Sequence, residues 1–139
     1  MRVDLLVEKL REQVLDSEIK IDDPILALSS WYIDVKANNF KVTIEYAPEL
    51  DLFGLASQDR GVEGTDEVYR NEQEIIQRAK VLLATRKSSV PGTVSPAAYE
   101  WARQEADRLK GKRPELYAEF SAVADTFESA TTKPLVKLV

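Results

Sequence analysis

Apolar residues recur at helical spacing where the chain begins. The apolar residues among the first sixteen positions recur three or four residues apart, and the residues between them are mainly charged. This pattern predicts an amphipathic helix over about residues 3–16. Its apolar members are Val3, Leu6, Val7, Leu10 and Val14. Further on, Asp23 and Pro24 predict the start of a short turn or helical piece that runs through Leu28.

Two later segments alternate between apolar and polar residues, which is typical of half-buried β-strands. Residues 31–36 have their apolar members at odd positions, and residues 40–46 have them at even positions. Asn38 and Asn39 lie between the segments, and asparagine tolerates the left-handed conformations that a tight turn requires. The sequence therefore predicts a β-hairpin, with Tyr32 on the face opposite to the apolar one.

A third strand and a second helix are predicted next. Residues 50–56 supply the strand, in which Gly54 indicates a bulge or the close approach of another segment. Asn71, with Glu74 three residues later, predicts a capping box at the start of the helix. We expect the apolar stripe of this helix to pack on the apolar face of the hairpin. The stripe consists of Ile75, Ile76, Ala79, Leu82 and Leu83.

The rest of the chain predicts a linker and two more helices. Residues 87–94 are the only linker-like stretch. Ser95 and Pro96 cap and start a helix that ends at Gly111, and Pro114 starts the last one. The last helix carries an apolar stripe, formed by Leu116, Phe120, Val123 and Phe127 beside Tyr117 and Ala124.

These elements predict an α+β fold: an N-terminal helix, a three-stranded antiparallel sheet, a packed helix and a C-terminal helical hairpin. We expect the 139 residues to form a single domain. Residues 1–86 would be its αβββα body, and residues 87–139 its linker, hairpin and apolar tail. The tail, residues 134–139, is β-prone, so we expect it to pair or pack within the structure, or else to add a strand to a neighbouring subunit.

Composition narrows the function classes. The chain contains no cysteine and no histidine. Disulfides, thiol catalysis, catalytic pairs that use histidine, and the usual zinc, copper or haem ligands are therefore excluded. No cofactor or metal is expected, and a non-enzymatic protein that binds another macromolecule becomes the leading interpretation.

Charge then limits the partner. The net charge is −5, with −6 in residues 1–86 and +1 in residues 87–139. An acidic body repels phosphate backbones and favours a basic protein partner. No stretch approaches the apolar length of a membrane span, and the first residues lack the apolar region of a signal peptide, so we expect a cytoplasmic protein without membrane contact.

Candidate contact residues gather around the loop at residues 57–67. Its acids, with two glycines between them, fit neither the ligand spacing of a calcium loop nor a phosphate-binding loop. Two interpretations of this loop remain: a solvated connection, or a surface that contacts a basic protein. An exposed tyrosine beside these acids would add an aromatic anchor. The protein-contact candidates are Tyr32, Asp51, Asp59, Glu63, Asp66 and Glu67.

An enzymatic alternative rests on Asp34 and Lys36, which share one face of the predicted strand. With Asp22 or Asp23 upstream and Glu8 or Glu12 on the first helix, they are similar to the carboxylate and lysine arrangement of magnesium-dependent nucleases. In those enzymes the first acid lies on a strand, whereas here Asp23 precedes Pro24 in a predicted turn. A structural subunit that oligomerises through the C-terminal helices or the tail is a further alternative.

Basic residues at the bend between the last two helices are similar to those of a helix-turn-helix DNA-binding motif. The exposed side of the following helix, however, carries acidic side chains, which are unsuited to reading the edges of DNA bases. The residues at the bend are Arg103, Arg108, Lys110, Lys112 and Arg113. We therefore expect no nucleic-acid binding. The leading hypothesis is a small bacterial-type regulatory protein, immunity- or antitoxin-like, that inhibits a basic partner.

Overall fold

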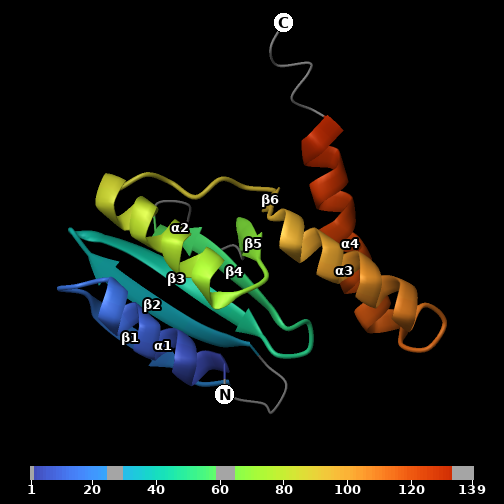
Figure 1. Cartoon of the computed structure of the whole chain (residues 1–139), viewed down its shortest axis with the longest axis horizontal. Helices are drawn as coiled ribbons and strands as arrows, with labels where there is room; N and C mark the ends of the chain where they lie inside the picture. The colour runs from blue at the N-terminus through green and yellow to red at the C-terminus, as the bar shows by residue number, and fades with distance from the viewer. Residues whose placement is uncertain (1, 25–29, 59–64, 133–139) are drawn as a thin grey trace, which may run out of the picture.

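The computed structural model describes residues 2–24, 30–58 and 65–132. Within these ranges the chain forms four helices and one six-stranded sheet (Figure 1). The helices are α1 (Arg2–Gln13), α2 (Glu72–Thr85), α3 (Pro96–Leu109) and α4 (Pro114–Thr132). The strands are β1 (Glu18–Asp22), β2 (Trp31–Ala37), β3 (Phe40–Ala47), β4 (Leu52–Ser57), β5 (Glu67–Tyr69) and β6 (Thr93–Val94).

The sheet is larger than the predicted three strands. Its spatial order follows the chain from β1 to β6, with antiparallel neighbours throughout except for the parallel pair of β5 and β6. The α+β class is confirmed, and the antiparallel three-stranded sheet is corrected to a mixed six-stranded one. The three additional strands have only five, three and two residues, and such short segments are defined by the neighbours they pair with more than by their own sequence.

The central hairpin follows the predicted alternation. Asn38 and Asn39 have φ angles of 55° and 56°, the left-handed pair that a two-residue turn between β2 and β3 needs. Asn38 also donates from Nδ2 to the carbonyl oxygen of Leu83, 3.2 Å away, which ties the turn to α2. Tyr32 lies on the face opposite to the apolar one, as expected, and its side chain is exposed.

The main core lies between one face of the sheet and the two helices α1 and α2. The predicted stripe of α2 packs there against the apolar face of the hairpin, which confirms that prediction. Alternation along the strands explains the arrangement, since every second side chain of β2 and β3 is buried. The most buried members include Leu6, Leu10, Ile33, Ile44, Phe53, Leu55, Ile75 and Leu82.

A second core forms on the opposite face, where α3 and α4 pack against residues of β4 and β6. In Figure 1 these two helices lie beside the end of the sheet that β5 and β6 form. Leu52 belongs to this second core whereas the next residue, Phe53, belongs to the first, so β4 contributes to both. Val94 joins Leu52 from β6. The helical hairpin supplies Ala98, Ala102, Ala106, Leu109, Leu116 and Phe120.

The stretch predicted as a linker is attached to the sheet. Ser89 is buried, and its amide and hydroxyl exchange hydrogen bonds of 2.9 Å with the hydroxyl and amide of Ser57. The Ser89 hydroxyl also contacts Asp66 Oδ2, and residues 93–94 pair with β5 as β6. The helical hairpin is therefore anchored to the body before α3 begins.

Two sequence predictions concern residues outside those described: most of the turn over residues 24–28, and the tail over residues 134–139. Among the helices that the structure describes, none has the length and apolar character to cross a bilayer.

Candidate functional site

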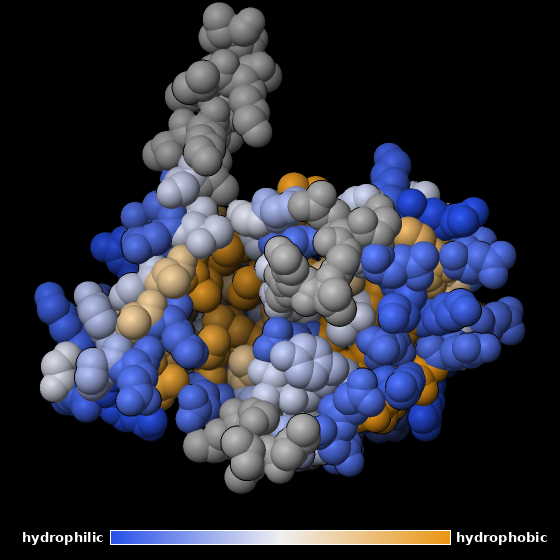
Figure 2. All heavy atoms as spheres, turned by 180° about the vertical axis from the view of Figure 1, so that it is seen from behind, coloured by the Kyte–Doolittle hydropathy of each residue, from blue (hydrophilic) through white to orange (hydrophobic). Residues whose placement is uncertain are grey.

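A groove runs across the face of the sheet opposite to α1 and α2, which we call the back face. It lies between α4 and the strands that α3 and α4 leave uncovered. Figure 2 shows it from behind as a hollow with an apolar floor. Its widest part, about 540 Å³, lies by the β3–β4 turn and is bordered by Tyr32, Leu50 and Glu119. A narrower part of about 100 Å³ follows, and then a part of about 320 Å³ beside β6. Adjacent parts share lining residues, so the three form one continuous groove.

The floor of the groove is apolar. Leu50 and Leu52 contribute from the β3–β4 turn and the start of β4, and Val123 contributes from α4. Leu52 is buried, whereas Leu50 and Val123 are half-buried and border the open space. Val68 and Val123 continue the floor into the part beside β6. An apolar strip of this kind is the usual centre of a surface that contacts another protein.

The charged residues that border the groove are all acidic. Among the described lining residues they are Asp22, Asp23, Glu45, Glu49, Asp66 and Glu119, with no lysine or arginine among them. Asp22, Asp23, Glu49 and Glu119 surround the widest part, and none of them has a hydrogen-bond or ion-pair partner among the described residues. The groove therefore combines an apolar floor with an acidic rim, and at its widest part four of the carboxylates have no partner among the described residues.

Tyr32 and Glu45 form the side of the groove that the sheet provides. Glu45 accepts hydrogen bonds from Ser30 Oγ at 2.6 Å and from Thr65 Oγ1 at 2.9 Å, which fix its carboxylate. Its negative charge, together with partial burial, raises the pKa of Tyr32 above that of an ordinary phenol. Tyr32 is 44% exposed and borders the widest part.

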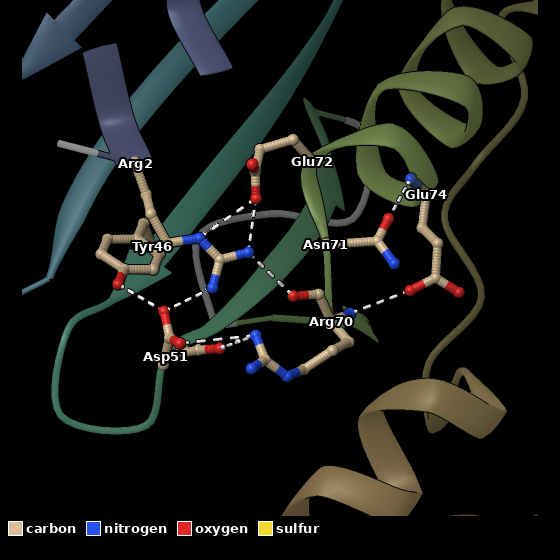
Figure 3. A network of polar contacts seen from close by, with 7 residues as sticks. All are labelled: Arg2, Tyr46, Asp51, Arg70, Asn71, Glu72 and Glu74. Carbon is tan, nitrogen blue, oxygen red and sulfur yellow. Dashed lines mark hydrogen bonds and ion pairs between the residues drawn. The ribbon is translucent and has the colours of Figure 1, made fainter. Parts of the chain in front are cut away.

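The β3–β4 turn, which carries Glu49 and Leu50, is held by a polar network (Figure 3). Asp51, with a left-handed φ of 55°, accepts from Arg2 and, at 2.7 Å, from the Tyr46 hydroxyl. Arg70 contacts the same carboxylate at 3.4 Å, and Arg2 also binds Glu72 at the start of α2. Burial and the Asp51 carboxylate raise the pKa of Tyr46 to about 12.

Asn71 confirms the predicted helix cap, because its Oδ1 accepts from the Glu74 amide at 2.9 Å. The reciprocal bond of the capping box is displaced by one residue, since the Glu74 carboxylate accepts from the Arg70 amide (Figure 3). Arg70 is thereby positioned between the turn and α3, where its guanidinium lies 4.1 Å from the centre of the Trp101 ring. Trp101 Nε1 donates to the Leu50 carbonyl at 2.8 Å. The β3–β4 turn and the helical hairpin are therefore directly linked.

The structure separates the predicted contact residues. Tyr32 and Asp66 border the groove at its two ends, and Asp66 also accepts from Ser89. Asp51 belongs to the network that holds the turn. Asp59 and Glu63 lie outside the described residues.

Glu67, the remaining candidate, is fully buried. It accepts from Arg78 at 2.7 and 3.0 Å, from the Tyr69 hydroxyl at 2.6 Å and from the Val90 amide at 2.8 Å. A side chain enclosed in this way stabilises the fold and offers no atom to a partner at the surface.

Sequence reasoning missed Glu49, Leu50, Glu119 and Val123. Glu119 and Val123 are four positions apart on α4, which places them on one face of the helix. That spacing was visible in the sequence. Nothing in the sequence showed that this face would lie opposite the β3–β4 turn.

The residues expected of a magnesium-dependent nuclease are only partly brought together: Asp22, Asp34 and Lys36 lie on the back face of the sheet, with Asp22 on β1 rather than in a turn, whereas the glutamates of the first helix do not. Asp34 lies on the back face, where it accepts from Thr43 at 2.7 Å. Glu8 and Glu12 belong to α1, which covers the other face. No group of three acidic side chains within the described part of the chain is arranged to hold a metal ion.

Two bases near the bend between α3 and α4 are engaged within the hairpin. Arg108 binds Glu105 at 2.7 Å, and Arg103 contacts the Tyr99 hydroxyl at 2.7 Å and Glu128 at 3.4 Å. These contacts are those of an ordinary solvated helical hairpin.

Comparison with known proteins adds no relative. No family model, no curated protein and no solved structure matches the chain.

Proposed function

We propose that this chain is a non-enzymatic regulatory protein that binds a basic region of another protein in the groove between α4 and the back face of the sheet. The observation that carries the proposal is the lining of the groove: an apolar floor with only acidic residues among its charged neighbours. Apolar contact supplies affinity, and the unpaired carboxylates select a partner of opposite charge and speed the encounter.

The absence of histidine and cysteine supports a binding role over catalysis, because the side chains that most often act as nucleophile or general base at neutral pH are missing. An inhibitor of the immunity or antitoxin class fits this set of properties. Such a protein would act by covering a basic surface that its partner needs. This class assignment rests on size, charge and the groove.

Site-specific photo-crosslinking in the native host tests the proposal. One variant carries the crosslinking residue at Ala122, which borders the groove, and the control carries it at Gln104, an exposed position on α3. We expect one basic protein to be captured from Ala122 and not from Gln104. The captured protein is then purified, and its affinity is measured by titration calorimetry.

The decisive comparison is between two glutamates of α4. Glu119→Gln removes a charge from the groove, and Glu115→Gln removes one from an exposed position of the same helix that does not border it. Loss of affinity in the first variant alone supports the proposal. Equal affinity in both variants, or a partner that is not basic, contradicts it.

A further inference from the structure

The groove has two chemically different parts, and their order along it restricts what can occupy it. The widest part has the exposed ring of Tyr32 on one side and the carboxylates of Asp22, Asp23, Glu49 and Glu119 around it. The narrow part that follows is mostly apolar. The two parts share Ala47 and Leu50, so a ligand that fills one lies directly against the other.

The four exposed carboxylates around this hollow have no cationic partner among the described residues, and like charges that share one part of a surface repel one another. A neighbouring carboxylate shows the contrasting situation: Asp51 is neutralised by Arg2 and Arg70. No cation of the described residues plays that part in the widest hollow. A cationic side chain from a ligand would relieve the repulsion, and the exposed face of Tyr32 is a suitable surface for an ammonium or guanidinium group.

The narrow part has the opposite requirement. Leu50, Leu52, Val68 and Val123 border a space of about 100 Å³, which is suited to one aliphatic or aromatic side chain rather than to a folded surface. Removing this apolar area from water supplies affinity that the exposed carboxylates alone do not provide, because exposed ion pairs are screened by water and contribute little.

Resting on the proposed function, we infer that the groove recognises a single chain segment of the partner in which a lysine or arginine stands next to an apolar residue. The cation would lie between Tyr32 and the carboxylates, and the apolar side chain would lie against Leu50 and Val123. Recognition would then depend on this pair of neighbouring side chains and not on the overall charge of the partner.

The test uses a phage-displayed library of short random peptides selected on the intact protein. We expect the enriched peptides to carry lysine or arginine next to an aliphatic or aromatic residue. An enriched peptide is synthesised together with two controls of equal length: one with serine in place of the apolar residue, and one with glutamine in place of the base. Fluorescence anisotropy should show each control to bind about tenfold more weakly or worse.

Protein variants locate the binding. Glu119→Gln and Val123→Ser should each weaken the enriched peptide by about fivefold or more, while Glu115→Gln leaves it unchanged. Circular dichroism and thermal melting establish that each variant is folded. Because Glu119 is exposed and has no partner among the described residues, its substitution tests the groove without disturbing either core.

Three results would overturn the inference: no enrichment, enrichment of peptides without the basic and apolar pair, or binding that the groove variants do not alter. The proposed function is judged separately, by the native partner captured from Ala122. If that partner is basic and depends on Glu119, but its contacting segment lacks the pair, the inference fails and the proposed function stands. If the peptides bind as expected but the native partner does not depend on Glu119, the proposed function fails alone.

Discussion

Replacing Arg78 by methionine removes the cation that faces a fully buried carboxylate. Glu67 has no exposed surface, and two of its four hydrogen bonds come from the Arg78 guanidinium. Methionine keeps most of the length of the aliphatic chain, so the main loss is the charge and its two donors. The Glu67 carboxylate would then be left buried with only the Tyr69 hydroxyl and the Val90 amide as donors.

The cost of removing one partner of a buried ion pair is about 3–5 kcal/mol. The Arg78 side chain is itself 29% exposed, so water can reach the space it leaves, and we expect about 3 kcal/mol. The matched control is Arg108→Met. Arg108 forms a similar two-pronged contact with Glu105, but its side chain is 61% exposed, so water screens the pair and we expect a much smaller loss.

The measurement is urea-induced unfolding at neutral pH, with the free energy of unfolding compared among wild type, Arg78→Met and Arg108→Met. A loss in Arg78→Met no greater than that in Arg108→Met would refute the reasoning. It would mean that the buried carboxylate is compensated by its other donors, or that it takes up a proton at little cost.

Acid titration provides a second readout of the same contact. Burial by itself raises the pKa of Glu67, but the hydrogen bonds from Arg78, Tyr69 and the Val90 amide outweigh it and lower the pKa below its ordinary value. A carboxylate with a lowered pKa stabilises the fold above its unfolded pKa of about 4.3, and this contribution is lost as the pH falls through the folded value. Arg78→Met should therefore lose less stability than wild type when the pH is lowered below about 4.3.

Three further predictions concern packing and nucleic acid. Leu82→Ala should lower the free energy of unfolding by about 2–5 kcal/mol, since the side chain is 1% exposed. Val81→Ala, at a position that is 49% exposed, should lower it by less than about 0.5 kcal/mol. Urea unfolding measures both values, and equal values would contradict the assigned core face. Gly54→Ala should lower the melting temperature, because its new Cβ would lie 2.2 Å from Thr65 Cγ2. Adding Thr65→Gly to this variant should restore part of the loss. An unchanged melting temperature in Gly54→Ala would show that the Thr65 side chain moves aside at little cost. The pure protein should neither shift duplex DNA in a salt-sensitive way nor nick it with magnesium; nicking that is lost in Asp34→Ala would favour the nuclease alternative.

Local sequence patterns predicted the elements that local forces determine. The alternation of residues 31–36 and 40–46, the two asparagines between them and the cap at Asn71 were sufficient for the hairpin and for the start of α2. The expectation at Gly54 was confirmed as a close approach, since Thr65 lies against it and the register with Glu45 continues without a bulge.

The missed elements depend on contacts between distant residues. β6 has only two residues and carries no pattern, whereas β1 carries a short one, in which Ile19 and Ile21 alternate with charged residues over five positions. The burial of Glu67 was equally hidden. In the sequence it stands next to Asp66 in an acidic stretch that reads as exposed, and only its pairing with Arg78, eleven residues later, makes its burial possible.

The groove also depends on contacts between distant residues, so the sequence alone could not predict it. Its acidic rim is unusual for a boundary between two cores that serves only to stabilise the fold. The groove forms where two cores that share β4 diverge: Phe53 faces α1 and α2, and Leu52 faces α3 and α4. The helical hairpin covers only the end of the back face, so apolar residues at the margin of the second core, such as Leu50 and Val123, remain partly accessible. A margin of this kind needs only neutral polar neighbours to be stable in water. Four exposed carboxylates without a cationic partner among the described residues add repulsion and do not stabilise the isolated chain, whereas a basic ligand of the kind proposed would be attracted to them.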